Sequence, residues 1–526
     1  MPSKSTKVKL SPFVNEAPTN FSNPKEAAAM KKAFEKVRAQ FGRTHFGRIA
    51  GEKISANTDF QSINPCNKKE VLGTFPNHTE SEAEKALMAA TEAFQSWQKV
   101  PVEKRAQYLF KAAALMRKRK HEFSAALGLE IGKNWGEADM ETAEAIDFLE
   151  FYARDAFKYQ GPQAVVKSPK WLGKEENQMI YIPLGVGVSL PPWNFPLAIL
   201  GGMTLAPIVM GNTMVLKPSP DAPFIASMFM ALMEEVKLPK GVLNLVYGGA
   251  EVGEALVSSP LTRFISFTGS KNVGLRINEV AAKTQPGQRW MKRLVAELGG
   301  KDAIIVDREA DLDAAAQGVV QSAFGFSGQK CSACSRVLVD EKVYDKFLEK
   351  LVPKVETIKI GDAEQNAVMT SVSSEKAFKK VSEYIEIGKQ EARLLTGGQY
   401  RNENGFFIEP TVFADVPKDA RIAREEIFGP VLSIVKVKDL NEGLEVANSS
   451  EYGLTGGVFT KNKKKLERVR EEMMVGNLYL NRKITGALVG VHPFGGFNMS
   501  GTDSKTGGKD YLLLFVQAKT ITERIN

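Results

Sequence analysis

Short apolar segments alternate with helical segments between residues 213 and 270, and this alternation restricts the fold more than any other feature of the chain. Strands separated by helices pair in parallel through right-handed crossovers, with helices on both faces of the sheet. Ligands of such sheets bind at the carboxyl ends of the strands. The expected strands are residues 213–217, 242–247 and 264–268, and the expected helices are residues 222–236, residues 251–258 and one from about Asn272.

A second alternation begins after Glu297. Residues 303–306 and 335–339 are strand-like, and helical segments run up to residue 324 and over residues 341–358. A chain of 526 residues is longer than one hydrophobic core supports. We therefore predict a second α/β domain that ends near Leu480.

The flanking regions have a different character. Residues 1–50 are polar, with a helical patch near residues 24–41, and are typical of an arm laid over another part of the molecule. Thr79 opens a capping box followed by an amphipathic helix, and residues 102–157 form a long helical region broken near Gly132. Residues 512–522 are strand-like with no obvious partner nearby, which is typical of an edge covered by another subunit.

Charge and cysteine content exclude several classes of protein. The net charge is +9, but basic and acidic residues are interleaved and no groove-reading motif is present, so we expect no nucleic-acid partner. The longest apolar stretch, residues 196–211, is too short for a membrane span and predicts a buried helix. Three cysteines and an N-terminus without an apolar signal segment indicate the cytoplasm.

Two of the three cysteines lie in the segment FSGQKCSACSR, residues 326–336. A metal site needs further ligands, but the four histidines are scattered and we expect no metal. A redox pair favours a CxxC at the start of a helix after a strand, whereas here a strand-like segment follows. A thiolate nucleophile and an inert turn are the other interpretations. With so few histidines, a carboxylate would be the base for a nucleophile.

The segment FTGSKNVG, residues 267–274, follows a strand and opens a helix. Helix N-termini bind phosphate through free N–H groups and the helix dipole. The full G-x-G-x-x-G spacing is absent, so taken alone the segment is either a dinucleotide site or an ordinary turn. Lys217, at the end of another strand, is either a ligand of ribose hydroxyls or a surface lysine.

Seven motifs in order resemble the aldehyde dehydrogenase superfamily. They are PWNFP at 192–196, LKPSP at 216–220, FTGS at 267–270, ELGGK at 297–301, GQKC at 328–331, EEIFGPV at 425–431 and PFGGFNMSG at 493–501. The resemblance implies an α/β fold with a Rossmann-type nucleotide-binding domain, an α/β catalytic domain and a small β oligomerisation flap. The implied boundaries are an arm at 1–50, the NAD-binding domain at 51–157 and 174–297, the catalytic domain at 298–485, and the flap at 158–173 and 486–526.

The same resemblance implies catalytic roles. Cys331 matches the nucleophile and Cys334 is a bystander. The side-chain amide of Asn194 and the backbone N–H of Cys331 match the oxyanion donors, and Glu297 matches the base that activates water.

The resemblance also implies NAD as cofactor and a homo-oligomer, a dimer or larger. Many NAD-preferring relatives have Glu where this chain has Pro220, so no carboxylate there repels a 2′-phosphate and NADP would be tolerated. The expected cofactor-binding residues are Trp193, Lys217, Ser219, Gly269, Ser270, Gly274, Glu426 and Phe428.

Three segments, at the N-terminus, from Gly136 and from Thr485, resemble the 1-pyrroline-5-carboxylate dehydrogenases, also called L-glutamate γ-semialdehyde dehydrogenases. This branch of the family oxidises the semialdehyde, a small molecule, to L-glutamate. The implied anchors for the substrate α-carboxylate and its aliphatic part are Ser332, Gly486, Ala487, Phe195 and Phe494. For the two aromatic residues, core packing is the other interpretation. The other functional hypotheses are a different semialdehyde or general aldehyde dehydrogenase, and a non-catalytic family member.

Overall fold

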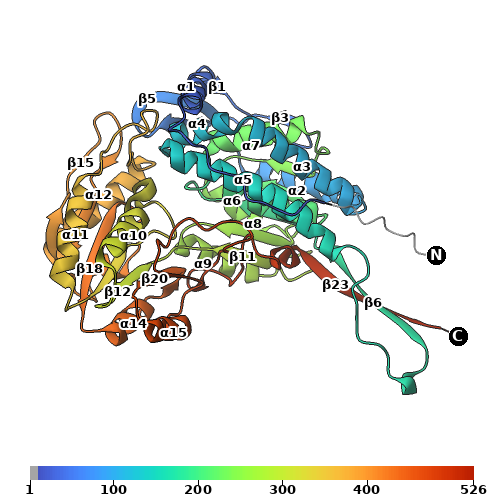
Figure 1. Ribbon diagram of the computed structural model, residues 1–526. Helices are drawn as coiled ribbons and strands as arrows, with labels where there is room; N and C mark the ends of the chain where they lie inside the picture. The colour runs from blue at the N-terminus through green and yellow to red at the C-terminus, as the bar shows by residue number, and fades with distance from the viewer. Residues whose placement is uncertain (1–9, 526) are drawn as a thin grey trace.

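The computed structural model describes residues 10–525; residues 1–9 of the predicted arm lie outside the described part. Two large sheets flanked by helices form the body, and a β-ribbon projects from it (Figure 1).

The first large sheet has seven strands in the order β11-β10-β7-β8-β9-β2-β3. The strands from β11 to β9 run parallel, which confirms the predicted arrangement, whereas β2 and β3 add antiparallel strands at one edge. Part of the predicted arm thus belongs to this sheet, because Arg48 of β2 pairs with Leu245 of β9. The bounds are β2 (Gly47–Ile49), β3 (Glu52–Ile54), β7 (Val186–Leu190), β8 (Thr213–Leu216), β9 (Leu243–Leu245), β10 (Phe264–Thr268) and β11 (Arg293–Glu297).

Helices cover both faces of this sheet. On one face, α2, α8 and α9 pack Leu87, Val252 and Ile277 into one cluster with the strands. On the other face, α3 to α7 and the N-terminal α1 share the largest core cluster. The predicted capping box is present, since Thr79 N–H donates to Glu82 Oε2 at 3.0 Å. The bounds are α1 (Pro24–Arg38), α2 (Glu80–Trp97), α3 (Val102–Lys118), α4 (Lys120–Ile131), α5 (Trp135–Asp155), α6 (Ala198–Val209), α7 (Pro223–Glu235), α8 (Ala250–Ser258) and α9 (Lys271–Ala282).

The predicted break near Gly132 is confirmed, because α4 ends there with Gly132 in the left-handed conformation, φ 75°. The apolar segment around α6 is buried, as predicted. Within residues 10–525, no helix combines the length and apolar character that a membrane crossing requires.

The second large sheet has the order β14-β17-β18-β13-β12-β20-β21, and only β14 is antiparallel to its neighbour. Helices α10 and α11 pack on one face, with Val319 and Phe347 in the core, and α12 and α14 pack on the other. The strand bounds are β12 (Ala303–Val306), β13 (Arg336–Asp340), β14 (Arg393–Thr396), β17 (Thr411–Ala414), β18 (Val431–Val437), β20 (Thr455–Phe459) and β21 (Asn477–Leu480). The helix bounds are α10 (Leu312–Phe324), α11 (Tyr344–Glu356), α12 (Glu375–Glu391), α13 (Arg421–Arg424), α14 (Leu440–Asn448) and α15 (Lys463–Glu472).

Smaller strand groups complete the body. A three-stranded sheet has the order β1-β5-β4, and two further pairs are β15-β16 and β19-β22. The bounds are β1 (Arg43–Thr44), β4 (Asp59–Asn64), β5 (Asn67–Pro76), β15 (Tyr400–Arg401), β16 (Phe407–Ile408), β19 (Tyr452–Gly453) and β22 (Phe497–Asn498).

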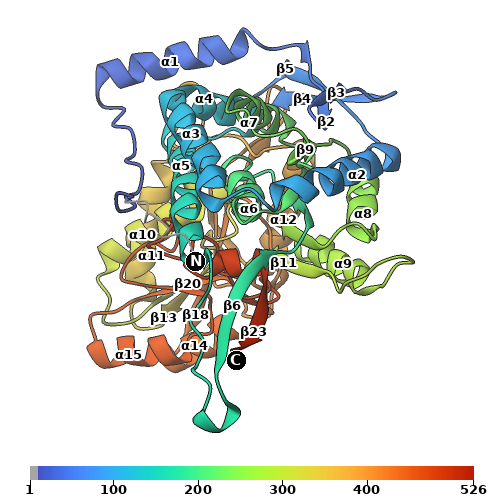
Figure 2. The same cartoon turned by 90° about the vertical axis from the view of Figure 1, so that its right-hand side faces the viewer.

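The projecting ribbon consists of β6 (Glu175–Pro183) and β23 (Val516–Arg524), paired antiparallel along their whole length (Figure 2). The tail expected to lack a partner in its own surroundings therefore has one within the chain. Because Val516 pairs with Pro183, more than 300 residues earlier, no local pattern could reveal the partner. The predicted domain boundary at residue 174 assigns β6 to the NAD-binding domain and β23 to the flap, although the two strands pair with each other.

Candidate active site

Four predicted site residues lie at the carboxyl ends of four neighbouring parallel strands. Asn194 follows β7, Lys217 follows β8, Gly269 follows β10, and Glu297 ends β11. The order β11-β10-β7-β8 places these ends along one edge of the sheet. Because carboxyl ends of adjacent parallel strands meet at the same edge, residues distant in sequence converge at one site.

The cysteine loop belongs to the second half of the chain and follows α10. It begins with a 3-10 turn, Gly325–Gly328, in which Phe326 and Ser327 have φ of 51° and 54°. Such left-handed residues need support from their surroundings. Ser327 Oγ donates to Thr370 O at 2.9 Å, and the buried Gln329 accepts from Ser373 N at 2.8 Å. The loop thus reaches Cys331 with a fixed backbone.

The two cysteines of this loop occupy different environments. Cys334 is 1% exposed and its thiol contacts Arg336 O at 3.3 Å, whereas Cys331 is partly exposed. Burial, together with the carboxyl groups of Asp302 and Glu297, raises the pKa of the Cys331 thiol well above its usual range. At rest Cys331 is a neutral thiol that must lose a proton before it can act as a nucleophile.

Asn194 connects the first sheet with the cysteine loop. Its side chain is 5% exposed, and Nδ2 donates to Gln329 O at 3.0 Å. Gln329 is two residues before Cys331. The bond fixes the amide beside the loop, where an oxyanion donor is required.

Glu297 is a partly buried carboxyl group at the end of β11. Its Oε1 accepts from Ser504 Oγ at 2.7 Å, and its buried Oε2 has no partner within the described residues. Burial raises the pKa of Glu297 from 4.5 to about 8, while Ser504 and Lys505 oppose the rise. A carboxyl group that titrates near neutral pH suits a general base.

Glu426 and Phe428 lie on a third loop, which contacts the loops of Cys331 and Asn194. Glu426 Oε1 accepts from Gly300 N at 2.9 Å, and a Cβ on Gly300 would lie 2.8 Å from Cys331 O. Phe428 packs edge-on against Trp193 with ring centroids 5.5 Å apart. Glu426 and Phe428 therefore lie beside both the cysteine loop and the loop that carries Asn194.

The carboxyl ends of the strands in the first sheet have features suited to binding a dinucleotide. Ser270 precedes α9 and its side chain makes no capping hydrogen bond, so the first N–H groups of the helix are open to a phosphate. A Cβ on Gly274 would lie 2.3 Å from Leu298 Cδ2, so only glycine allows this close approach of α9. Ser219 lies in the turn after β8, where its Oγ accepts from Asp221 N at 3.3 Å.

Lys217 is a buried cation of this region. It is 9% exposed, and Nζ donates to Gly248 O at 2.8 Å and Pro218 O at 3.1 Å. Burial lowers its pKa to about 8. Its amine is held at the strand ends, which excludes the interpretation of a freely solvated surface lysine.

Among the predicted substrate anchors, Ser332 follows Cys331 directly in the chain, and Gly486, Ala487 and Phe494 lie in the segment after β21. Ser332 is partly exposed and its carbonyl accepts from Thr455 Oγ1 at 3.4 Å, and Gly486 has φ of 79°. Phe494 exchanges backbone hydrogen bonds with Thr506. Within residues 10–525, no hydrogen bond joins Ser332 directly to Gly486 or Ala487.

His492 has a local role in the loop of Gly486 and Ala487. Its Nδ1 accepts from Leu488 N at 3.2 Å, and its Nε2 lies 3.5 Å from Arg482. Burial and the charge of Arg482 lower its pKa, so the ring is neutral and can accept at Nδ1. It therefore fixes the loop backbone rather than adding a charge.

A charged network that supports the site was not predicted from the sequence. It is formed by Lys133 and by Glu141 of α5. Lys133 is fully buried, pairs with Glu141, and lies 3.6 Å from the ring centroid of Phe195. Glu141 Oε1 in turn accepts from Leu197 N at 2.9 Å, in the segment that carries Asn194. The acidic residues on the buried face of α5 were the available signal.

A second missed ion pair joins Glu137 of α5 with Lys330, with Nζ and Oε2 2.6 Å apart. Lys330 is the residue before Cys331. Helix α5 thus holds both the loop of Asn194 and the cysteine loop.

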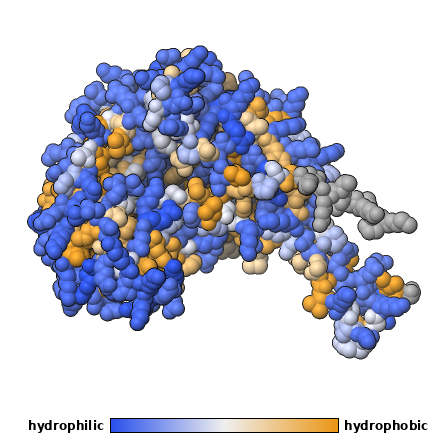
Figure 3. Space-filling view, viewed as in Figure 1, coloured by the Kyte–Doolittle hydropathy of each residue, from blue (hydrophilic) through white to orange (hydrophobic). Residues whose placement is uncertain are grey.

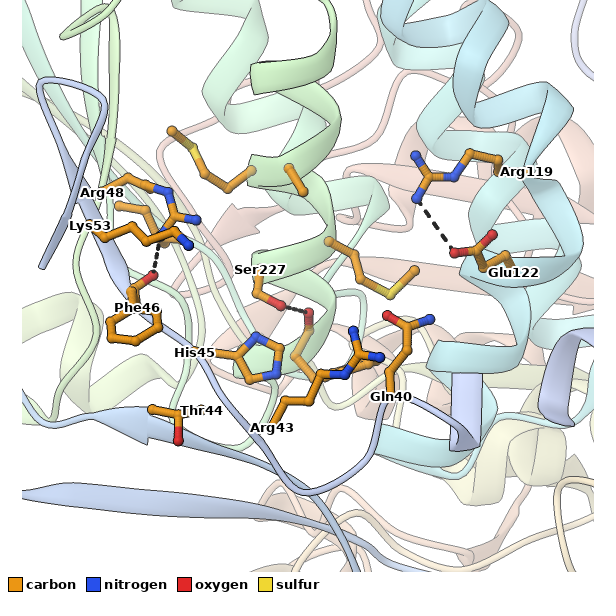
Figure 4. Close-up of a pocket in the computed structure, with 15 residues that line it drawn as sticks. Gln40, Arg43, Thr44, His45, Phe46, Arg48, Lys53, Arg119, Glu122 and Ser227 are labelled. Carbon is orange, nitrogen blue, oxygen red and sulfur yellow. Dashed lines mark hydrogen bonds and ion pairs between the residues drawn. The ribbon is translucent and has the colours of Figure 1, made fainter. Parts of the chain in front are cut away.

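A cavity of about 290 Å³ lies elsewhere, between the segment after α1 and helix α7 (Figure 4). None of the predicted site residues lines it. Two of its cations are already paired with carboxylates: Arg48 with Glu234, and Arg119 with Glu122 and Glu235. This hollow is therefore a charged surface cleft rather than the catalytic site.

An α/β fold of two large sheets, with a cysteine loop bonded to a loop at the carboxyl edge of the first sheet, defines a class of cysteine-dependent oxidoreductases. The chain belongs to the aldehyde dehydrogenase family, whose profile matches residues 52–521. The resemblance predicted from the motifs is confirmed.

Relatives extend over almost the entire chain. A 1-pyrroline-5-carboxylate dehydrogenase of Geobacillus sp. is 54% identical over 516 residues, covering 98% of this chain and 99% of that protein. One from Bacillus subtilis is 53% identical over 513 residues, covering 97% and 99%. Among solved structures, 1-pyrroline-5-carboxylate dehydrogenase from Thermus with bound NAD is 50% identical, with a TM-score of 0.96, covering 98% of this chain and 100% of that one.

Proposed function

We propose that the protein oxidises L-glutamate γ-semialdehyde, formed from 1-pyrroline-5-carboxylate, to L-glutamate with NAD. The observation that carries the chemistry is the bond from Asn194 to Gln329, which joins an amide donor to the cysteine loop. The observation that carries the substrate is the similarity to 1-pyrroline-5-carboxylate dehydrogenases over nearly the whole chain.

The first step falls to Cys331. Its thiol loses a proton to solvent water and the sulfur attacks the aldehyde carbon, whose C=O electron pair moves to the oxygen and gives the thiohemiacetal oxyanion. The Asn194 amide and the Cys331 N–H stabilise the oxyanion, because fixed donors in a dry site need no reorganisation. Since burial and neighbouring carboxylates raise the pKa of this thiol, proton removal is part of the barrier.

NAD, when bound, would supply the hydride acceptor, and loss of the hydride from the thiohemiacetal carbon leaves a thioester on Cys331. The start of α9 and Lys217 would hold its phosphates and adenosine ribose, and Glu426 would orient the nicotinamide ribose. Trp193 and Phe428, which pack edge-on against each other, would lie beside that ribose. Pro220 places no carboxylate beside the 2′ position, so the site would also tolerate NADP.

Glu297 completes the reaction. It takes a proton from water, whose oxygen attacks the thioester carbon and releases the Cys331 sulfur and the carboxylic acid. A pKa of about 8 lets the carboxyl group gain and lose this proton near neutral pH.

Substrate selection depends on a group that ordinary aldehydes lack. We assign the α-carboxylate to Ser332 and to the backbone of Gly486 and Ala487, since N–H groups direct fixed dipoles at an anion. Phe195 and Phe494 flank the aliphatic part. Lys133 Nζ lies over the ring of Phe195, 3.6 Å from its centroid, and keeps that ring in place.

The projecting ribbon supports a homo-oligomer. Residues 165–172 at its tip expose Val166 at 93% and Trp171 at 83%, and Figure 3 shows hydrophobic surface on this ribbon. An exposed apolar tip and an unpaired strand edge favour docking on a second copy. We assign residues 158–183 and the C-terminal strand β23 to this flap, start the second NAD-binding segment at residue 184, count β2 with the NAD-binding domain, and keep the predicted catalytic domain at 298–485.

We also propose a cytoplasmic location, because all three cysteines are free and a reducing compartment keeps them so.

One assay tests this function. Reduction of NAD and NADP is measured with glutamate semialdehyde, succinate semialdehyde and a simple alkyl aldehyde. We expect the highest kcat/KM with NAD and glutamate semialdehyde. Preference for either of the other aldehydes would contradict the substrate, and absence of reduction with all of them would contradict the activity.

A further inference from the structure

A serine lies against the catalytic carboxyl group, on a loop more than 200 residues away in sequence. Ser504 is 5% exposed, and its Oγ donates to Glu297 Oε1 at 2.7 Å. The other oxygen, Oε2, is buried without a partner within the described residues. The two oxygens of the same carboxyl group are therefore not equivalent.

The backbone around Ser504 is tied to β11. Leu298 N donates to Ser500 O at 2.8 Å, and Thr502 N donates to Ala296 O at 3.0 Å. These bonds bracket Glu297 on both sides. Ser504 is thus held in one position relative to the carboxyl group it contacts.

The side of the Ser504 loop that faces Gly495 is also tightly packed. A Cβ on Gly495 would lie 1.7 Å from Ser504 O and 2.9 Å from Glu297 Oε1. Only glycine leaves room for the serine and the glutamate together. The contact is built into the packing of the loop.

We propose that Ser504 is the positioning residue for Glu297: its hydroxyl holds Oε1, so that Oε2 is the oxygen that takes the proton from the hydrolytic water. This inference rests on the proposed function. In the step, one O–H bond of water breaks and its proton goes to Oε2. The water oxygen bonds to the thioester carbon, and the C–S bond breaks with its electron pair on Cys331.

The hydroxyl also affects the acidity of Glu297. A donor to a carboxylate favours its ionised form, and burial opposes ionisation. The pKa of Glu297 is also affected by Lys505 and Asp503 on the same loop, by the backbone of Gly496, and by the neighbouring Cys331 and Tyr511.

Lys505 cannot replace the serine. Its Nζ is held by the carbonyls of Gly476 and Gly495, so it contributes charge but no hydrogen bond to the carboxyl group. Ser504 is the side chain in direct contact.

The test is Ser504→Ala, followed by NADH formation with glutamate semialdehyde. The first turnover should keep its NADH burst, because Glu297 is needed only afterwards. The steady-state rate should fall about tenfold to a hundredfold, the loss expected for a hydrogen bond to a charged group. The acid limb of the steady-state pH profile should move to higher pH, since the carboxylate loses a donor.

Thr502→Val is the matched control. Thr502 lies on the same loop, and its Oγ accepts from Ala296 N at 3.0 Å without touching the carboxyl group. This variant should lower the melting temperature but leave the acid limb in place. An acid limb that moves equally in both variants, or in neither, would overturn the proposal.

A measurement without turnover separates this proposal from the proposed function. The protonated-carboxyl infrared band of Glu297, assigned by its absence in Glu297→Gln, is titrated in folded Ser504→Ala. We expect its midpoint at higher pH than in the wild type, whatever the substrate is. An unchanged midpoint would contradict the positioning role, whereas a wild type that reduces NAD with none of the aldehydes would contradict only the proposed function.

Discussion

Asn194 Nδ2 donates to Gln329 O at 3.0 Å, across 135 residues of sequence, and this bond connects the end of β7 with the loop of Cys331. The two loops come from different sheets. Because each loop is also tied to α5, through Glu141 and Glu137, the oxyanion donor and the nucleophile are fixed to a common support.

We expect Asn194→Ala to slow the NADH burst about 100- to 1000-fold, the usual effect of losing an oxyanion donor. Stopped-flow absorbance measures it. Asn212→Ala is the matched control, since Asn212 is equally buried and donates to Pro207 O and Phe515 O away from the thiol. The control should lose stability and keep its burst rate; an equal loss in both would assign Asn194 a structural role only.

Cys331→Ala should abolish turnover and leave NAD binding intact, because only the covalent step needs the thiol. Cys334→Ala should keep most activity and lose some stability, since Cys334 lies in the core of the second sheet. Activity assays and NAD titration by fluorescence measure both. The reverse pattern would make Cys334 the nucleophile.

How much of this structure can be predicted from the sequence depends on how far apart in the sequence the interacting residues lie. Strand β10 was predicted with its observed bounds, because a buried parallel strand is a continuous apolar run. The pairing of β6 with β23 and the contact of Ser504 with Glu297 join segments more than 200 residues apart, and no local pattern encodes them. β2 was missed because three residues carry too little periodicity.

The same limit applies to the site. The catalytic residues were predicted because their motifs resemble those of the family, but the buried pair of Lys133, in the α4–α5 connection, and Glu141, on α5, looks in sequence like ordinary surface charge. Only the packing of α5 against α6 shows that these charges face inward.

Glu297→Gln should show an NADH burst followed by a slow steady state, because hydrolysis of the thioester loses its base while hydride transfer does not. Rapid quench with mass spectrometry should detect the acyl-enzyme. Absence of the burst would place Glu297 before hydride transfer.

The same variant should change how stability depends on pH. The pKa of Glu297 in the folded protein, about 8, exceeds its ordinary value of 4.5, so folding favours the neutral form. The stabilisation is complete below pH 4.5 and is lost as the pH rises through 8. Since glutamine does not ionise, the apparent Tm of Glu297→Gln should fall less between pH 5 and pH 9, by about 2 °C. If the Tm of the variant and the Tm of the wild type changed equally with pH at one scan rate, the raised pKa of Glu297 would be contradicted.

The last prediction concerns the substrate. If Ser332, Gly486 and Ala487 bind an α-carboxylate, an alkyl aldehyde leaves those donors unpaired, at about 1–3 kcal/mol each. Glutamate semialdehyde should therefore exceed an alkyl aldehyde of equal length by at least ~100-fold in kcat/KM. Ser332→Ala should lower this kcat/KM ratio, chiefly by lowering kcat/KM for glutamate semialdehyde, the substrate that carries the carboxylate. L-glutamate should inhibit competitively against the semialdehyde. Equal efficiency on both aldehydes without inhibition by glutamate would leave a general aldehyde dehydrogenase, because a site that binds the α-carboxylate must also bind the product that carries it.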